Sequence, residues 1–279
     1  MGLGTHRVPR IVFCDMDGTF LAADKSIPER NLQALDALHE AGVPFVPCSG
    51  RSFEAIPPEV RTHPASAYVI ACNGALVCET DGTVLRRRPM DTEAVLSLYE
   101  KVKGLPITFD VFADGVIWSE RARYDVMDDM HIDPGTLGML KRMRHPTDLT
   151  VPEVIAKHGQ VDKVTCFFGS SADMATVRRL VDEDPTMWGT SGARGNIEIM
   201  ATGVSKGDAV TWLCDRLDIP VDVAAGVGDS PNDREMLVAC GVGVAVANAV
   251  TETMQVADVV CPSGDEGGVG VYLHSFLTR

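Results

Sequence analysis

Two aspartates stand one residue apart at the end of an apolar run. The run IVFCDMDGTF (11–20) contains Asp15 and Asp17, and a glycine and a threonine follow at once. In a strand, residues two apart face the same side and lie about 6.6 Å from each other, so both carboxylates could address one ligand. Two like charges near a strand end are unfavourable unless they are solvated, paired or bound to a cation. The pair therefore indicates a site that holds a positive group.

The residues after the pair narrow the choice of site. Gly18 permits a sharp bend away from the strand, and Thr19 offers a hydroxyl and a backbone amide. A calcium loop of the EF-hand type is excluded, because it requires Gly at position six and Glu at position twelve. Counted from Asp15, those positions hold Phe20 and Ser26. On this stretch alone, a capping pair without chemistry remains an alternative to a phosphate-and-metal site.

Further stretches place polar residues at the ends of apolar runs or at the starts of helices. In CSGR (48–51), the Ser49 hydroxyl and a loop amide such as that of Gly50 could bind a phosphate oxygen. In SKG (205–207), Lys206 brings its charge to a helix start, where free backbone N–H groups attract anions. Taken singly, Ser49 could be a helix cap and Lys206 a solvated surface charge.

The stretch GVGDSPNDREM (226–236) again puts a carboxylate between a strand and a helix. Asp229 follows the strand, and Asn232 and Asp233 come within one turn of it. By itself, Asp229 could also be a helix cap. Because the four stretches all stand at strand or helix ends, they together favour one shared site for a phosphate and a metal ion.

The elements that must position these residues are typical of a doubly wound α/β core. Nearly continuous apolar runs predict strands that are buried on both faces of a parallel sheet. Such runs occur at 8–14, 43–48, 67–72, 221–227, 242–246 and 257–261. Helical patterns lie between them at 28–42, 205–217 and 231–241. In such sheets ligands bind beyond the carboxyl ends of the strands, which is where the polar residues stand.

The middle of the chain has a different pattern. Two hairpins are predicted at 75–88 and 107–120, with turns at the Asp-Gly pairs 81–82 and 114–115. A helix at 91–103, a Met-rich stretch at 124–144, a strand at 163–168, a helix at 172–183 and strands at 187–191 and 196–200 follow. This mixture predicts an α+β cap domain, residues 86–190, inserted in a core formed by 1–85 and 191–279.

The bulk composition excludes several classes of protein. The 279 residues are 45% hydrophobic and include 25 basic and 39 acidic side chains, a net charge of −14. This charge disfavours nucleic acid and anionic membranes as partners. The N-terminus lacks the apolar stretch of a signal peptide, and no apolar run approaches the ~20 residues of a membrane span. The eight cysteines form no C-x-x-C, so we expect buried, reduced thiols in a cytoplasmic protein.

At the residues of the candidate site, the sequence resembles the haloacid dehalogenase (HAD) superfamily. It is similar to the Cof-type branch (subfamily IIB) of sugar-phosphate phosphatases, which carries a large α/β cap after the third core strand. The matching pieces are DMDGTF, SGR, NGA (73–75), SKG, GDSPND, VANA (246–249) and GGV (267–269). One departure is Phe20, where the family usually has Leu, and this puts only local packing in doubt.

The resemblance implies a role for each acidic residue. Asp15 would be the nucleophile that forms an aspartyl-phosphate, and Asp17 would protonate the leaving oxygen and then help to activate water. Mg²⁺ would be bound by the Asp15 carboxylate, the Asp17 carbonyl oxygen and Asp229. Asn232 and Asp233 would orient that shell.

The resemblance also implies the residues that hold the substrate. The phosphoryl oxygens would be held by Thr19, Ser49, Gly50 and Lys206. Asn73 and Gly74 would lie near the site or the substrate. The cap would contact the leaving group through the segment 108–144, with candidates Trp118, Arg121, Arg123, Tyr124, Asp125 and His131.

The expected function is a Mg²⁺-dependent phosphatase acting on small phosphorylated metabolites, sugar phosphates foremost, as a monomer or homodimer. A phosphosugar mutase on the same scaffold is the first alternative, although the compact GDSPND form favours a phosphatase. A non-enzymatic sensor of a phosphometabolite is the second. The presence of Asp15, Asp17, Lys206 and Asp229 disfavours the sensor.

Overall fold

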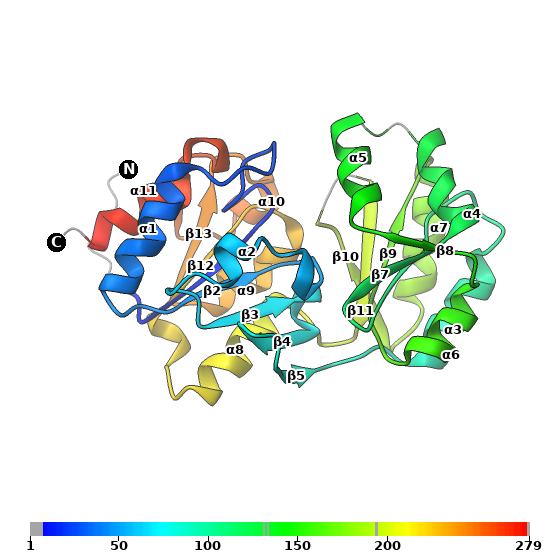
Figure 1. Ribbon diagram of the computed structural model, residues 1–279, viewed down its shortest axis with the longest axis horizontal. Coiled ribbons are helices and arrows are strands. Elements are labelled where there is room, and N and C mark those ends of the chain that lie inside the picture. Colours follow the sequence, from blue (N-terminus) through cyan, green and yellow to red (C-terminus); the bar gives the residue numbers. More distant parts are fainter. Residues whose placement is uncertain (1–7, 131, 133, 193–194, 278–279) are drawn as a thin grey trace. The chain divides into compact units, whose positions relative to one another are not determined.

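A computed structural model describes residues 8–130, 132, 134–192 and 195–277 of the chain. Its contacts divide the chain into two compact units (Figure 1). The first unit consists of Met1–Arg86 and Ser205–Arg279, and the second of Arg87–Val204. The second unit is therefore an insertion within the chain of the first.

A sheet of eight strands forms the centre of the first unit, in the order β14-β13-β12-β1-β2-β3-β4-β5. The strands from β14 to β3 are parallel, and β4 is antiparallel to β3. Their bounds are β1 (Ile11–Asp15), β2 (Phe45–Cys48), β3 (Tyr68–Ala71), β4 (Leu76–Glu79), β5 (Val84–Arg87), β12 (Ala224–Gly228), β13 (Val242–Val246) and β14 (Val259–Cys261). Strand β1 lies between β12 and β2, and all five of its residues are buried.

Helices flank this sheet. Ile11 and Phe13 of β1 belong to an apolar cluster with helices α8 (Lys206–Arg216) and α9 (Arg234–Ala239). Helices α1 (Glu29–Glu40) and α11 (Gly268–Leu277) pack on each other, away from α8 and α9 (Figure 1). The shorter helices are α2 (Pro58–Arg61), α10 (Thr251–Met254) and the 3-10 turns Phe53–Ala55, Cys72–Gly74, Val221–Val223, Pro231–Asp233 and Gly264–Glu266. The predicted α/β fold with a parallel sheet is confirmed.

Two elements of the first unit differ from the sequence prediction. The strand predicted at 221–227 begins only at Ala224, because Val221–Val223 form a 3-10 turn after Pro220. The helix predicted at 231–241 is a 3-10 turn, Pro231–Asp233, followed by α9. In that turn the Asp233 backbone N–H donates to the Ser230 carbonyl at 3.0 Å, a bond across three residues that makes a tighter turn than an α-helix has.

The second unit is built on a sheet of six strands in the order β10-β11-β9-β6-β7-β8. The pairs are antiparallel except β7 with β8, which are parallel. The strands are β6 (Asp110–Ala113), β7 (Val116–Glu120), β8 (His145–Thr147), β9 (Val161–Phe167), β10 (Met187–Thr190) and β11 (Asn196–Ala201). Strand β11 pairs with both β9 and β10, so the domain boundary expected at 190 is corrected to 204.

Helices α3 (Thr92–Val102), α6 (Val151–His158) and α7 (Ser171–Asp182) pack on the sheet of the second unit (Figure 1). The Met-rich stretch forms α4 (Arg121–Asp125), a 3-10 turn (Val126–Asp129) and α5 (Pro134–Arg142). Met127 and Met130 pack with Leu140 and Phe167. His131, a candidate from the sequence, lies outside the described residues.

Two expectations from composition concern the whole chain. All eight cysteines are free and buried, as expected. Among the described residues, no helix has the length and apolar character that a bilayer span requires.

Candidate active site

Asp15 is the last residue of the central strand β1, and only 5% of it is exposed. Its neighbours in the sheet are fixed by register, because Cys14 is opposite Val227 of β12 and Asp15 is opposite Cys48 of β2. The loops that follow these two strands therefore meet at Asp15. The sequence prediction that polar residues gather at this edge of the sheet is confirmed by the contacts that follow.

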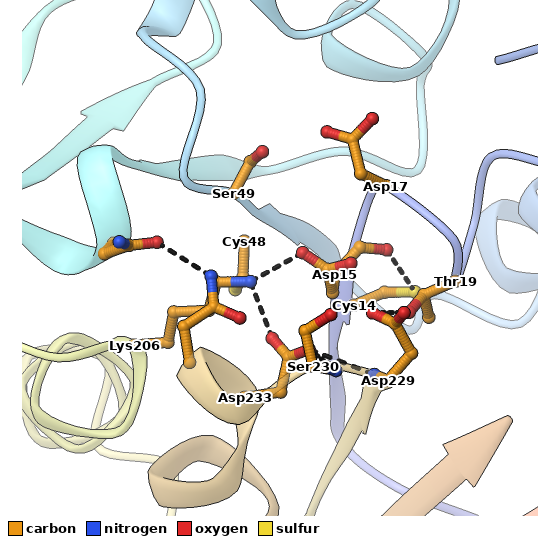
Figure 2. Close-up of polar contacts among 12 residues, drawn as sticks. Cys14, Asp15, Asp17, Thr19, Cys48, Ser49, Lys206, Asp229, Ser230 and Asp233 are labelled. Atoms are coloured by element: carbon orange, nitrogen blue, oxygen red, sulfur yellow. Dashed lines mark hydrogen bonds and ion pairs between the residues drawn. The ribbon is translucent and has the colours of Figure 1, made fainter. Parts of the chain in front are cut away.

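Lys206 reaches Asp15 from the first turn of α8. The Ser205 side chain caps this helix by accepting the Asp208 backbone N–H. The Lys206 ammonium is fully buried and donates to Oδ1 of Asp15 at 2.5 Å and to Oδ1 of Asp233 at 2.6 Å (Figure 2). Burial by itself would lower the pKa of Lys206, but the two carboxylates hold that pKa above its ordinary value. The lysine is therefore charged.

Asp233 is held firmly on both sides of its carboxylate. Oδ1 accepts the Lys206 ammonium, and Oδ2 accepts the backbone N–H groups of Asp229 at 3.0 Å and Ser230 at 2.9 Å. Gly228 is required here, since a Cβ at this position would lie 2.4 Å from the Cβ of Asp233. Both Asp233 oxygens already have donors, which suits an orienting residue.

Three carboxylates gather around the one lysine. Ligand oxygens of Asp15, Asp229 and Asp233 all lie within 4.8 Å of one another. Burial and the Asp233 carboxylate raise the pKa of Asp15, and the same two causes raise the pKa of Asp229 to about 7. Within the described part of the chain, the buried Oδ2 of Asp15 has no hydrogen-bond partner. The cluster thus carries surplus negative charge and an open carboxylate oxygen, which fits a hard cation such as Mg²⁺.

Thr19 and Gly18 lie against Asp229. The Thr19 hydroxyl donates to Oδ1 of Asp229 at 3.2 Å (Figure 2). Gly18 has a φ of +82°, and a Cβ there would lie 2.8 Å from Oδ2 of Asp229. The Asn248 amide donates to the Gly18 carbonyl and accepts the Gly264 N–H, both at 2.8 Å. Only glycine lets the backbone turn this close to Asp229.

Asp17 does not face the carboxylate cluster. Its side chain points away from Asp15 (Figure 2), and both its oxygens accept the Arg51 guanidinium at 2.7 Å. The Lys25 ammonium lies 2.9 Å from Oδ1 of Asp17. Burial would raise the pKa of Asp17, but the hydrogen bonds and charge of Arg51 lower it strongly overall. The strand spacing argument does not extend to Asp17, because β1 ends at Asp15 and the chain then turns.

The loop after β2 is tied to the turn after β3. The Ser49 hydroxyl accepts the Arg51 N–H at 3.1 Å, and the Ser49 carbonyl accepts the Asn73 N–H at 3.0 Å. Gly50 lies in the same loop. The Asn232 side-chain amide donates to Oδ1 of Asn73 at 3.1 Å. These bonds connect the loops after β2, β3 and β12.

Gly74 lies where the turn after β3 touches the start of α8. Its φ is +97°, and a Cβ would lie 2.2 Å from the backbone oxygen of Ser205. The close approach brings this turn against the helix that carries Lys206. Asn73 and Gly74, which the resemblance places near the site, therefore lie next to the loop of Asn232 and the start of α8.

Sequence reasoning missed three residues at the site: Arg51, Lys25 and Asn248. Arg51 and Asn248 stood within quoted motifs, SGR and VANA, but no contact pattern in the sequence pointed to their partners. Among the second-unit candidates, Arg121 pairs with Asp148 and Arg123 donates to the Ile107 carbonyl. Substrate contact by those candidates stays a prediction.

The fold and the site place the chain in a known family. The family model described as haloacid dehalogenase-like hydrolase matches residues 12–273. The chain therefore belongs to that family, and the resemblance drawn from the motifs is confirmed.

Individual relatives match nearly the whole chain. Phosphatase YwpJ of Bacillus subtilis (strain 168) is 24% identical over 292 residues, which cover 96% of this chain and 100% of that protein. A solved haloacid dehalogenase-like hydrolase from B. subtilis superposes with a TM-score of 0.85 at 22% identity, covering 95% of this chain and 98% of the other. The HAD subclass IIB sugar phosphatase BT4131 superposes with a TM-score of 0.82 at 20% identity, covering 96% and 98%. The two structures share the fold of this chain, including its inserted unit.

Proposed function

We propose that this hydrolase is a Mg²⁺-dependent phosphatase that cleaves small phosphorylated metabolites, sugar phosphates foremost, through an aspartyl-phosphate on Asp15. One observation carries the proposal. The Asp15 carboxylate has one oxygen on the buried Lys206 ammonium and its other oxygen buried without a partner among the described residues. Such a carboxylate is oriented by its partner and open on one side, which are properties that suit a nucleophile.

The reaction would run in two displacements at phosphorus. A carboxylate oxygen of Asp15 attacks the phosphorus, the ester P–O bond breaks, and the leaving oxygen takes a proton from Asp17. Water then attacks the phosphorus of the aspartyl-phosphate and gives its proton to Asp17, which releases inorganic phosphate and restores Asp15. Lys206 offsets negative charge on the phosphoryl oxygens in both steps, with Ser49, Gly50 and Thr19 as the further phosphate contacts.

The ion pairs of Asp17 with Arg51 and Lys25 bear on its proposed role as the proton donor. Arg51 and Lys25 both stabilise the ionised carboxylate, so Asp17 cannot hold a proton while it stays in that pair. We infer that Asp17 leaves Arg51 before it protonates the leaving oxygen. Arg51 then acts as a positioning residue for Asp17.

The metal would be held by the carboxylates of Asp15 and Asp229 and the carbonyl oxygen of Asp17. Asp233 and Asn232 would orient this shell, because both Asp233 oxygens already accept other donors. Mg²⁺ supplies charge that offsets the repulsion between the anionic Asp15 and an anionic phosphate.

The name of one solved relative and the presence of the inserted unit support the proposed substrate class. BT4131, whose fold this chain shares, is a sugar phosphatase, and we propose that residues 87–204 select the alcohol part of the ester. We further propose a cytoplasmic reaction, in keeping with eight free, buried cysteines.

Phosphate release tests this proposal directly. The wild-type protein is incubated with and without Mg²⁺ and a panel of sugar phosphates, nucleotides, phosphoglycolate and p-nitrophenyl phosphate. Asp15→Asn is compared with Asp36→Asn, a matched control whose side chain is 73% exposed. We expect release that needs Mg²⁺, is lost in Asp15→Asn and persists in Asp36→Asn. Full activity in a folded Asp15→Asn variant would overturn the assignment, and silence across the panel would favour a mutase or a sensor.

A further inference from the structure

The turn that follows β1, residues 16–21, joins the proposed nucleophile to the rest of the site. We call it the β1 turn. It carries Asp17 and Thr19, and Thr19 is fully buried, with its hydroxyl donating to Oδ1 of Asp229 at 3.2 Å (Figure 2). The course of this turn therefore decides where a proposed acid, a proposed phosphate contact and a proposed metal ligand lie.

Two asparagine side chains from outside the β1 turn hold its backbone carbonyls. Nδ2 of Asn31 donates to the Phe20 carbonyl, and Nδ2 of Asn248 donates to the Gly18 carbonyl, both at 2.8 Å. Gly18 and Phe20 are the two neighbours of Thr19 in the sequence. The turn is thus held on both sides of the residue that contacts the carboxylate cluster.

The other end of each asparagine amide binds residues 264–270, which we call the C-terminal segment. Oδ1 of Asn31 accepts the Gly270 N–H at 2.7 Å, and Oδ1 of Asn248 accepts the Gly264 N–H at 2.8 Å. Each amide therefore uses its donor on the β1 turn and its acceptor on the C-terminal segment. A side chain must both donate and accept to make this bridge, which an amide does and a carboxylate or an alkyl group does not.

The C-terminal segment also approaches the turn and α1 closely. A Cβ at Gly264 would lie 2.6 Å from the Gly18 backbone oxygen, and a Cβ at Gly270 would lie 2.4 Å from the Arg30 backbone oxygen. The segment contains the motif GGV (267–269), which has no part in the proposed chemistry. Its glycines allow backbone to lie directly on backbone, which brings the two N–H groups within reach of the asparagines.

The burial of Asn31 shows that its polar contacts explain its presence. It is 0% exposed and belongs to the buried face of α1 with Ala34, Leu35 and Leu38. Asparagine has a lower helix propensity than alanine or leucine, and a buried amide is unfavourable unless it is hydrogen-bonded. Apolar packing alone would favour another residue here. The two hydrogen bonds to the turn and to the C-terminal segment are what an apolar residue could not supply.

We propose that Asn31 and Asn248 are positioning residues, which hold the β1 turn in the conformation that the reaction needs by binding it to residues 264–270. The link to turnover rests on the proposed function, in which the turn carries the acid Asp17 and the phosphate contact Thr19. A displacement of about 1 Å at a catalytic group lowers a rate by about 100-fold. Loss of either bridge should therefore slow catalysis without removing a catalytic group.

The variants are chosen in matched pairs and made in the whole chain. Asn248→Ala removes an amide at an exposed position, and Gln255→Ala removes another exposed amide from the same part of the chain. Asn31→Ala removes the buried amide of α1, and Gln33→Ala removes an exposed amide of the same helix. Asn248→Ala keeps the test decisive if Asn31→Ala does not fold.

The kinetic measurement compares kcat with KM for whichever phosphate ester the wild type hydrolyses fastest. Values of kcat are expressed per folded molecule, with the folded fraction taken from circular dichroism. We expect kcat to fall about ten- to a hundredfold in both asparagine variants. KM should stay within about threefold of the wild-type value, because Lys206 and Ser49 lie outside the turn and still bind the phosphate. Both glutamine variants should match the wild type.

Hydrogen exchange separates the inference from the proposed function, because it needs neither substrate nor turnover. The Gly18 N–H donates to the Leu21 carbonyl and the Thr19 N–H to the Met16 carbonyl, so exchange at these amides reports opening of the β1 turn. In both asparagine variants, peptides that cover the turn should exchange about five- to tenfold faster, as the loss of one hydrogen bond predicts. Peptides from the second unit should be unchanged.

The outcomes of the two measurements are distinct. Unchanged exchange in the β1 turn of the asparagine variants overturns the inference, whether or not the protein releases phosphate. Faster exchange throughout the molecule overturns it as well, since the role would then be stability alone, and so does an unchanged kcat per folded molecule. If exchange rises only in the turn and the wild type hydrolyses no ester, the proposed function fails while the attachment of the turn is confirmed.

Discussion

The Lys206 ammonium lies 2.5 Å from Oδ1 of Asp15, and both groups are buried. The two residues are 191 positions apart in the sequence and come from different elements, the end of β1 and the start of α8. Their contact orients the Asp15 carboxylate and places a positive charge beside a surplus of buried negative charge.

Replacing Lys206 by Met should affect both stability and turnover. The variant leaves Asp15 and Asp233 without their buried cation, and removal of one partner of a buried ion pair costs about 3 to 5 kcal/mol. Urea unfolding should show a loss of this size, and phosphate release should be abolished. Lys103→Met is the control, because Lys103 is half exposed and pairs with the exposed Glu100. Equal stability of Lys206→Met and wild type would contradict the role of the ion pair.

Mg²⁺ should stabilise the protein through the Asp15 and Asp229 carboxylates. A ligand that binds only the folded state at 100 times its dissociation constant adds about 2.7 kcal/mol, so the melting temperature should rise on adding Mg²⁺ to protein treated with EDTA. Asp229→Asn should remove most of that rise, whereas Asp222→Asn, at an exposed position, should keep it. A full rise in Asp229→Asn would place the metal elsewhere.

The contribution of Asp229 to the stability of the metal-free protein should decline as pH rises towards 7. The pKa of Asp229 is raised to about 7 by burial and by Asp233. The folded state therefore binds a proton that the unfolded state releases at a lower pH, so this residue's contribution to stability declines as pH rises towards 7. Thermal unfolding in EDTA between pH 5 and pH 8 should show a steeper decline for wild type than for Asp229→Asn. Parallel curves would contradict the raised pKa.

Gly74→Ala should disturb the site without touching a catalytic group. The added Cβ would lie 2.2 Å from the Ser205 backbone oxygen, so the start of α8 must shift and carry Lys206 with it. Gly42→Ala measures the cost of the left-handed backbone alone. Gly42 also has a positive φ, but a Cβ added there would have no atom within 4 Å.

We expect a loss of about 1 to 2 kcal/mol for Gly42→Ala from the left-handed backbone alone. A further loss of about 1 to 3 kcal/mol is expected for Gly74→Ala from overpacking. Only Gly74→Ala should lose phosphate release. Equal effects of the two variants in chemical unfolding and in the activity assay would contradict the close approach.

Much of the site could be predicted from the sequence, because its residues follow apolar strands. The carboxyl ends of parallel strands meet at one edge of the sheet, so Asp15 and Asp229 had to converge there, with Lys206 at the start of a helix. The orientation of Asp17 could not be predicted, since it depends on Arg51, 34 residues away, and on Lys25, which adopts a φ of +70°.

The extent of the second unit was harder to predict. The segment 196–200 reads as a strand, but its sequence does not say which sheet it joins, and pairing with β9 decides this.

The measurement that tests the central claim most directly is the identification of the residue that becomes phosphorylated. The enzyme is mixed with substrate and Mg²⁺, quenched in acid during the first turnovers and reduced with borohydride, which converts an acyl phosphate to an alcohol. Trypsin then yields the peptide Ile11–Lys25, in which fragment masses separate Asp15 from Asp17. The account predicts homoserine at position 15 and unmodified Asp17. Reduction at Asp17, or a peptide without any modification during active turnover, would contradict it.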